Sequence, residues 1–361
     1  MDGGGSAIAW PPRTDRGDEM AVDAFELTTV ADDAAVLHRG DQAFRYDGLR
    51  PDTDYEFEGV AAHTLARPDG ELLGRFATVN DVHFGELECG RIDDHPGGPI
   101  LRREPGERPY PEVMNAAAVA EIAAIDPAAV IVKGDLSNDG TDAEWAAFEA
   151  CYRTAFAARL HVVRGNHDAH RGQTAYAGDH WIELPGLAIG LLDTTIPHGT
   201  PGALRPEQIE WLDDHLAAAD RTLLLGHHQQ WVPGADGPER RSDDYFGLHP
   251  DSSDALDRAC ARHRNVIGYA AGHTHRHRVR RMAASGRPTI EVGCVKDFPG
   301  TWAEYRVFEG GVVQVVHRIS DPEALRWSNR CRVLYSDFNV DYEQYAMGTL
   351  ADRCFVMPAP L

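Results

Sequence analysis

Five apolar, strand-like runs in this sequence each end in a short turn that carries aspartate, asparagine or histidine. Buried runs of this kind, alternating with helical segments, are typical of a layered α/β domain. Turns that follow parallel strands meet at one edge of a sheet, so we expect these polar side chains to converge. In chain order the turns are Asp81-Val82-His83, Gly134-Asp135, Gly165-Asn166-His167-Asp168, Gly226-His227-His228 and Gly272-His273-Thr274-His275.

The remaining segments predict four parts along the chain. Residues 1–23 are rich in Gly, Pro, Arg and Asp and indicate a flexible arm. Short strand patterns in residues 24–75 predict a small β domain, and Leu49 to Tyr55 resembles a corner of fibronectin III-like sandwiches. Residues 76–320 form the α/β domain. Residues 321–361 make up an accessory C-terminal tail, whose aromatic residues predict docking on that domain or on a second copy of the chain.

Composition excludes several classes of protein. A formal charge of −22 on 361 residues repels a nucleic-acid backbone, so we expect no nucleic-acid polymer as partner. No run approaches the roughly 20 apolar residues of a membrane helix, and the first residues do not resemble a signal peptide. We therefore expect a cytoplasmic protein without a membrane partner. The 6 cysteines include no Cys-x-x-Cys pair and predict reduced thiols.

The residue types in the five turns suit a metal site. A single histidine beside an apolar run is more often structural, but five such turns in order favour shared metal ions. His273 and His275 point the same way in an extended chain, so both can approach one centre. Nitrogen and oxygen donors without cysteine suit manganese, iron, zinc or cobalt and do not choose among them.

In these five turns the sequence resembles the calcineurin-like metallophosphoesterase superfamily, over about residues 75 to 320. The resemblance implies a four-layer α/β/β/α sandwich, here preceded by the fibronectin III-like domain, as in purple acid phosphatases. It also implies two divalent or trivalent metal ions. Asp135 would bridge both ions, and His167 would contact the phosphoryl group or leaving oxygen, oriented by Asp168. The first ion would be held by Asp81, His83 and His275, and the second by Asn166, His227 and His273.

The activity implied by the resemblance is hydrolysis of small phosphodiesters, cyclic nucleotides among them, by a metal-bridging hydroxide. Purple acid phosphatases carry tyrosine three residues after the bridging aspartate, where this chain has Asn138. Class III cyclic-nucleotide phosphodiesterases usually have Asp or Asn there and match better. The alternative within enzymes is a phosphomonoesterase of nucleotides or sugar phosphates. A binding module with structural metals is the other class considered, although structural sites usually leave no ligand position for water.

Substrate contacts are predicted at four positions. Asn138 and His228 lie in the turns, next to the predicted ligands. Arg102 and Arg103 lie in the long segment at residues 84–111, which leaves from the predicted metal edge and is either a solvated loop or a cover over the substrate. Their guanidinium groups are suited to a phosphate.

Overall fold

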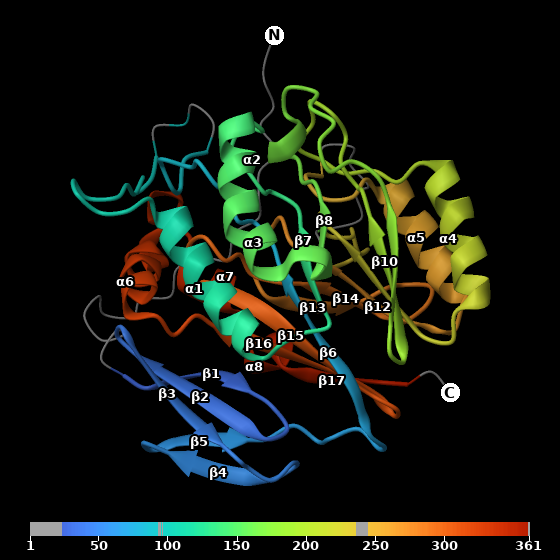
Figure 1. The fold of residues 1–361 in the computed structure, drawn as a ribbon, viewed down its shortest axis with the longest axis horizontal. Coiled ribbons are helices and arrows are strands. Elements are labelled where there is room, and N and C mark those ends of the chain that lie inside the picture. The colour runs from blue at the N-terminus through green and yellow to red at the C-terminus, as the bar shows by residue number, and fades with distance from the viewer. Residues whose placement is uncertain (1–23, 93–94, 96, 236–244, 360–361) are drawn as a thin grey trace.

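The computed structural model describes residues 24–92, 95, 97–235 and 245–359, so the predicted arm at residues 1–23 lies outside the described residues. The N-terminal part forms a three-stranded and a two-stranded antiparallel sheet, which lie below the main body in Figure 1. That these sheets are fibronectin III-like stays a prediction. Their strands are β1 (Glu26–Val30), β2 (Ala34–Arg39) and β3 (Gln42–Asp47), then β4 (Asp54–Phe57) and β5 (Val60–His63).

Two six-stranded mixed sheets form the main body. The first has the spatial order β13 (Arg278–Arg281), β14 (Pro288–Glu291), β12 (Val266–Ala271), β11 (Thr222–Gly226), β10 (Leu187–Leu192) and β9 (His180–Leu184). The second has the order β17 (Phe355–Pro358), β16 (Gly311–Arg318), β15 (Thr301–Phe308), β6 (Leu72–Val79), β7 (Ala129–Lys133) and β8 (Leu160–Val163). Parallel pairing of β6 with β7 and of β7 with β8, and likewise of β10 with β11 and of β11 with β12, confirms the predicted α/β arrangement.

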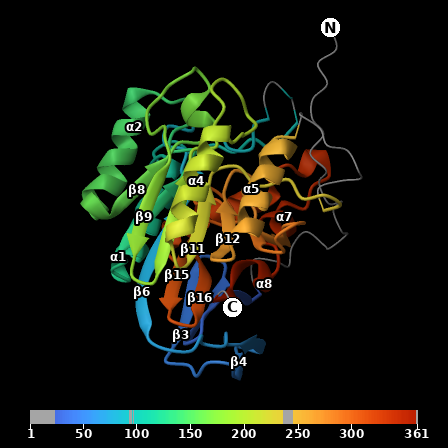
Figure 2. The ribbon, with the colours of Figure 1, turned by 90° about the vertical axis from the view of Figure 1, so that its right-hand side faces the viewer.

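Helices cover the outer faces of both sheets, as Figures 1 and 2 show. Successive residues of β7 divide between two cores, because side chains alternate along a strand. Val130 and Val132 face the helices outside the second sheet, whereas Ala129 and Ile131 lie between the sheets. The order of layers is therefore helix, sheet, sheet, helix. Outside the second sheet lie α1 (Tyr110–Ala124), α2 (Asp142–Phe148), α3 (Thr154–Phe156) and α6 (Pro322–Arg330); outside the first lie α4 (Pro206–Ala218) and α5 (Pro250–Arg262).

The C-terminal segment belongs to the same body. It contains α6, α7 (Tyr342–Met347), α8 (Leu350–Arg353) and β17, and β17 pairs with β16 at the edge of the second sheet. Trp327 and Tyr342 are buried in the core beneath α1. The segment thus packs on its own chain.

β6 connects the N-terminal sheets to the main body. The boundary expected between residues 75 and 76 falls inside this strand, whose pairing with β15 runs from Leu72 to Thr78. The three-stranded sheet also packs against β16, where the Thr29 hydroxyl donates to Val316 O at 2.7 Å. Arg306 of β15 pairs with Asp32 and Asp33 on the other side of this junction.

Two expectations from composition can be compared with the described residues. No helix within these residues combines the length and the apolar character needed to cross a membrane. All six cysteines are free thiols, and Cys151 alone of the six is not fully buried.

Candidate metal centre

The predicted ligands lie just beyond the ends of five strands that belong to both six-stranded sheets. The strands that lead into them are β6, β7 and β8 of the second sheet and β11 and β12 of the first. Within each of four overlapping groups, one ligand atom from every residue lies within 4.8 Å of the others. The groups are Asp81, His83 and His275; Asp81, Asp135 and His227; His83, Asp135 and His167; and His227, His228 and His273. The structure therefore brings the predicted ligands of the five turns into one cluster.

Five of these residues have a backbone conformation that non-glycine residues seldom adopt. Left-handed conformations of this kind cost energy and gather at functional sites, where the surrounding structure enforces them. They turn the chain sharply at each strand end and aim the side chain inward. The φ angles are 54° at Asp81, 44° at His83, 51° at Asp135, 67° at His273 and 55° at His275.

Glycines precede the ligands because the cluster is crowded. A Cβ atom at Gly134 would lie 2.5 Å from Nδ1 of His227, and one at Gly272 would lie 2.8 Å from a carboxylate oxygen of Asp81. A Cβ atom at Gly165 would collide with the Asp135 carboxylate. Any larger residue at these positions would displace a predicted ligand.

Nε2 of His227 faces two oxygen atoms. Its Nδ1 donates a hydrogen bond to Lys133 O at 2.8 Å, so in the neutral ring Nε2 carries a lone pair. This nitrogen lies 3.1 Å from Asn166 Oδ1 and 3.3 Å from Asp135 Oδ2. Three electron-rich atoms pointing at one another repel unless a proton or a cation lies between them.

His273 and His275 are oriented in the same way from outside the cluster. Nε2 of His273 donates to Phe246 O at 2.9 Å, which leaves Nδ1 with its lone pair. Nδ1 of His275 lies 3.3 Å from the Asp297 carboxylate, and its Nε2 faces Asp81 Oδ1 at 3.6 Å. Metal-binding histidines are commonly held by an outer acceptor of this kind.

His83 is the clearest sign of a ligand site. It is buried, and neither Nδ1 nor Nε2 has a hydrogen-bond partner, although Nε2 lies 3.5 Å from Asp135 Oδ2. Buried polar atoms are nearly always hydrogen-bonded, so two orphaned nitrogens on one ring require an explanation. The nitrogen and oxygen atoms of the cluster fit a divalent cation of the transition series.

The electrostatics of the cluster agree with its geometry. Burial lowers the pKa of His227, but the charge of Asp135 and its hydrogen bond, together with the charge of Asp81 and the carbonyl of Lys133, raise this pKa to about 9. Burial and the neighbouring positive charge of His227 lower the pKa of His273 to about 3. The pKa of His83 is held well below its usual range by burial and by the charge of Lys296. A proton on Nε2 of His227 thus lies where a cation would lie, against the oxygen atoms of Asp135 and Asn166.

His167 is oriented by a backbone carbonyl. Nδ1 of its ring donates to Asn138 O at 2.9 Å, which leaves Nε2 able to exchange a proton. We expected Asp168 to orient this ring, and the structure differs. The Asp168 carboxylate instead accepts hydrogen bonds from Gly165 N at 2.9 Å and from the backbone of Leu136 and Ser137 at 3.0 Å each. It therefore holds the turns of β7 and β8 together and acts on His167 only through them.

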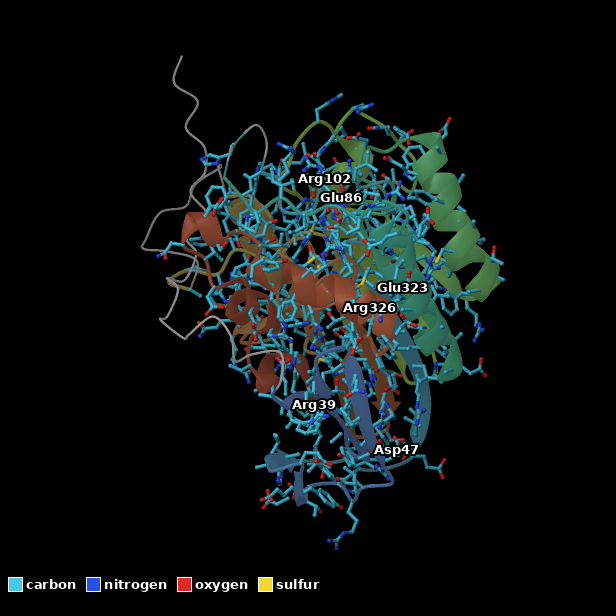
Figure 3. The ribbon with its side chains drawn as sticks, turned by 90° about the vertical axis from the view of Figure 1, so that its left-hand side faces the viewer. Arg39, Asp47, Glu86, Arg102, Glu323 and Arg326 are labelled. Carbon is cyan, nitrogen blue, oxygen red and sulfur yellow. The ribbon has the colours of Figure 1, made fainter. Side chains whose placement is uncertain are left out.

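The predicted substrate contacts differ in their surroundings. His228 lies beside the cluster, but its Nδ1 is 2.7 Å from the Thr194 hydroxyl and its Nε2 is 3.1 Å from Thr200 O. Arg102 pairs with Glu88, and Arg103 donates to Glu107 O at 2.6 Å. Arg102 and Glu86 lie at the end of the molecule far from Arg39 and Asp47 of the N-terminal sheet (Figure 3). That these side chains and Asn138 bind substrate stays a prediction.

Two outer acceptors of the proposed histidine ligands were not predicted from the sequence. The carbonyl of Phe246 cannot be recognised in the sequence, because every residue has a backbone carbonyl. Asp297 does have a signal, since it follows a buried strand, β14, as the other polar residues follow theirs. Five residues separate it from the strand end, so a search for polar residues directly after a strand does not find it.

The fold and the cluster together define a class: a double-sheet α/β sandwich whose strand ends converge on donors for divalent cations. The profile of the calcineurin-like phosphoesterase family matches residues 74–277, more than half of the chain. The chain belongs to this family.

Three similar proteins show how far the likeness extends. A probable cyclic nucleotide phosphodiesterase of Synechococcus sp. is 29% identical, over 44% of this chain and 62% of its own length. A 3',5'-cyclic adenosine monophosphate phosphodiesterase of Pseudomonas aeruginosa is 32% identical, over 30% of this chain and 42% of its own. The chain thus spans less than two thirds of these curated relatives. The crystal structure of a dimetal phosphatase from Danio rerio shares the fold, with a TM-score of 0.53 and 18% identity over 70% of this chain and 98% of that one.

Proposed function

We propose that this chain is a metal-dependent phosphoesterase that hydrolyses small phosphodiesters, cyclic nucleotides among them, with two metal ions. Asp135 is the proposed bridging ligand. The other proposed ligands are Asp81, His83 and His275 for one ion and Asn166, His227 and His273 for the other.

The observation that carries this proposal is the inward-facing lone pairs of the histidines. Outer acceptors hold one nitrogen of His227, His273 and His275, so that the other nitrogen of each ring is directed into the cluster. His83 adds a buried ring whose nitrogens have no partner among the described residues. The ring of His228 differs from these, because both of its nitrogens have partners within the protein, the Thr194 hydroxyl and Thr200 O.

Bound divalent cations would lower the pKa of a water molecule and offset the charge of the phosphoryl group. The protein supplies the geometry: the left-handed turns fix the ligands, and Asp168 locks two of those turns to each other. His167, with Nδ1 donating to Asn138 O, keeps Nε2 for proton transfer to the leaving oxygen. General acid catalysis of this kind contributes about 10²–10⁴-fold to a rate.

The choice of diesters rests on similarity and on one residue. The relatives from Synechococcus sp. and Pseudomonas aeruginosa carry the names of cyclic-nucleotide phosphodiesterases. Asn138 stands where a tyrosinate ligand of purple acid phosphatases would be. The nitrogen and oxygen donors proposed here suit manganese, iron and zinc equally. Experiment must therefore identify the metal.

The test compares a diester with a monoester. Bis(p-nitrophenyl) phosphate and p-nitrophenyl phosphate are supplied to protein stripped with chelator, with Mn, Fe, Zn or Co added back one at a time. Faster metal-dependent cleavage of the diester supports the proposal, and 3',5'-cyclic AMP and glycerophosphodiesters are then compared. Faster cleavage of the monoester would favour the phosphomonoesterase alternative. No cleavage with any metal would overturn the enzymatic assignment.

We also propose that the five N-terminal strands are a reduced fibronectin III-like unit. The support is a hydrogen bond from Arg50 N to the Tyr55 hydroxyl at 2.9 Å, which joins a tyrosine to the backbone a few residues upstream. Sandwiches of this class have a similar tyrosine corner. Tyr55→Phe should lower the melting temperature of this unit without altering turnover, and an unchanged melting temperature would count against the corner.

A further inference from the structure

Asp297 is a buried carboxylate that connects the proposed metal centre to the C-terminal segment. Its Oδ2 lies 3.3 Å from Nδ1 of His275. Its Oδ1 accepts hydrogen bonds from the Tyr342 hydroxyl and from Cys294 Sγ, both at 2.9 Å. The side chain is fully buried, so these contacts replace water completely. One oxygen is thus fixed by α7 while the other is presented to a proposed ligand.

A buried lysine lies between Asp297 and Glu86 and offsets part of their negative charge. Lys296 Nζ lies 3.6 Å from Asp297 Oδ2 and also contacts both oxygens of Glu86, at 2.6 and 2.7 Å. Buried charges persist when they are paired and hydrogen-bonded. Asp297 can therefore remain an anion and accept a hydrogen bond from Nδ1–H of His275.

α7 braces the same turn at a second point. The Tyr345 hydroxyl donates to Thr274 O at 3.1 Å, between the two proposed histidine ligands of this turn. His277 N donates to Ala346 O at 3.0 Å just after it. Tyr342 and Tyr345 are three residues apart in a helix, so they share one face. That face contacts both the backbone of the turn and the acceptor of His275.

We propose that Asp297, held in place by Tyr342, positions His275 for one of the two cations, so that the C-terminal segment completes the metal centre. The proposal rests on the ligand assignment made under the proposed function. Both residues lie outside the 74–277 match to the family. An acceptor at Nδ1 fixes the tautomer and the ring orientation of a ligating histidine, and losing it typically weakens metal binding by about 10–100-fold.

The experiment measures binding of Mn²⁺ to the full chain by isothermal titration calorimetry, independently of turnover. Wild-type protein should bind two Mn²⁺. Asp297→Leu should weaken one of the two sites by about 10–100-fold and leave the other within about twofold. Asp297→Asn keeps an oxygen acceptor for Nδ1–H and should recover part of the affinity. Tyr342→Phe removes one hydrogen bond to the carboxylate and should weaken the same site by about fivefold.

Two matched variants separate positioning from general destabilisation. Glu304 is an equally buried carboxylate that contacts a histidine, with Oε2 at 3.0 Å from His317 Nε2, but it lies outside the cluster. Tyr152 is a buried tyrosine whose hydroxyl donates to Asn115 Oδ1 at 2.7 Å. Glu304→Gln and Tyr152→Phe should bind Mn²⁺ as wild type does.

The outcomes are distinct. Wild-type affinity at both sites in Asp297→Leu, or in Tyr342→Phe should the leucine variant not fold, would overturn the proposed positioning. Equal losses in the two control variants would overturn it as well. A wild-type chain that binds no Mn²⁺, Fe²⁺ or Zn²⁺ would instead overturn the ligand assignment on which the proposal depends.

Discussion

Two buried clusters of charged residues contact the second sheet, and they are built in opposite ways. At the junction with the N-terminal sheet, the Arg306 guanidinium contacts Asp32 at 2.5 Å, Asp33 at 2.6 Å and Glu304 at 3.0 Å. His317 contacts Glu304 at 3.0 Å from the other side. Donors there face acceptors, so the chain neutralises its own charges.

In the metal centre, ring nitrogens face carboxylate and amide oxygens across a position that a proton on His227 or a cation would fill. Nε2 of His227 faces the oxygens of Asp135 and Asn166, and neither ring nitrogen of His83 has a hydrogen-bond partner among the described residues. The contrast teaches how a buried polar cluster is to be interpreted. Matched donors and acceptors stabilise the fold, whereas converging lone pairs indicate a charge that the chain does not itself supply. Variants of the two clusters should therefore fail in different measurements.

The largest effect is expected from Asp135→Ala. It removes the proposed shared ligand, and cations supply several kcal/mol of charge stabilisation in such reactions. We expect kcat/KM to fall on the order of 10⁴-fold or more, since each 1.36 kcal/mol is tenfold. Metal content, measured by mass spectrometry after gel filtration, should fall with it while circular dichroism stays unchanged. Full activity in this variant would contradict the ligand assignment.

His167→Ala should separate proton transfer from metal binding. The ring contacts the cluster but is held by Asn138 O, outside the proposed ligand set. We expect kcat to fall by about 10²–10⁴-fold with both metals retained. Turnover and metal content are measured on the same preparation. Wild-type turnover would show that the ring serves the fold alone.

Glu304→Gln tests the junction. The change removes a charge that Arg306 and His317 share, and hydrogen bonds to charged groups contribute about 1.5–3 kcal/mol each. We expect the free energy of unfolding in urea to fall by about 3 kcal/mol, with kcat/KM per folded molecule unchanged. A loss of activity with unchanged stability would reverse the contrast between the clusters.

Acid should lower the free energy of unfolding because His38, in the N-terminal sheet, is buried in its neutral form. Burial and the charge of Arg318 lower the pKa of His38 to about 3, against about 6.5 in the unfolded chain. The unfolded state therefore binds a proton first, and stability is lost as pH falls below about 6.5. Between pH 7 and pH 5 the loss is about 2 kcal/mol from this group. Urea unfolding of His38→Gln should show a pH dependence flatter by that amount.

A second histidine provides the control of opposite sign. Hydrogen bonds that His63 donates to Asp54 and Asp52 raise the pKa of this exposed ring. Its contribution to stability is therefore present at low pH and is lost as pH rises. His63→Gln should make the acid loss slightly steeper. A flatter profile in both variants would show that the effect does not come from His38.

The strand ends made much of the site predictable. A polar turn that follows a buried strand lies at the edge of the sheet, however the turn itself is folded. Asp81, Asp135 and His227 could therefore be predicted from the sequence as members of the cluster. The left-handed backbone at these turns could not, because it arises from crowding among residues far apart in the chain. Asn138 acts through its carbonyl, and Asp297 depends on a helix that follows it in the sequence.

The fold was predictable to a similar depth. Alternating strand and helix patterns predict the layered α/β body, and the sequence Thr141-Asp142-Ala143-Glu144 forms the capping box that begins α2. The segment from Leu72 to Val79 was expected to divide between two domains, yet it is one strand. Local strand patterns cannot show that both halves pair with the same neighbour, β15, which follows more than two hundred residues later.

The contact of Tyr345 with Thr274 O also sets an order of events in the cell. Chains grow from the N-terminus at roughly 5–20 residues per second, so Asp81 precedes Tyr345 by about 13–53 seconds of synthesis. During that interval the early ligands emerge without the helix that braces the last ones. If α7 completes the centre as proposed, the site that His275 serves reaches its full affinity for a cation only after Tyr345 has been synthesised.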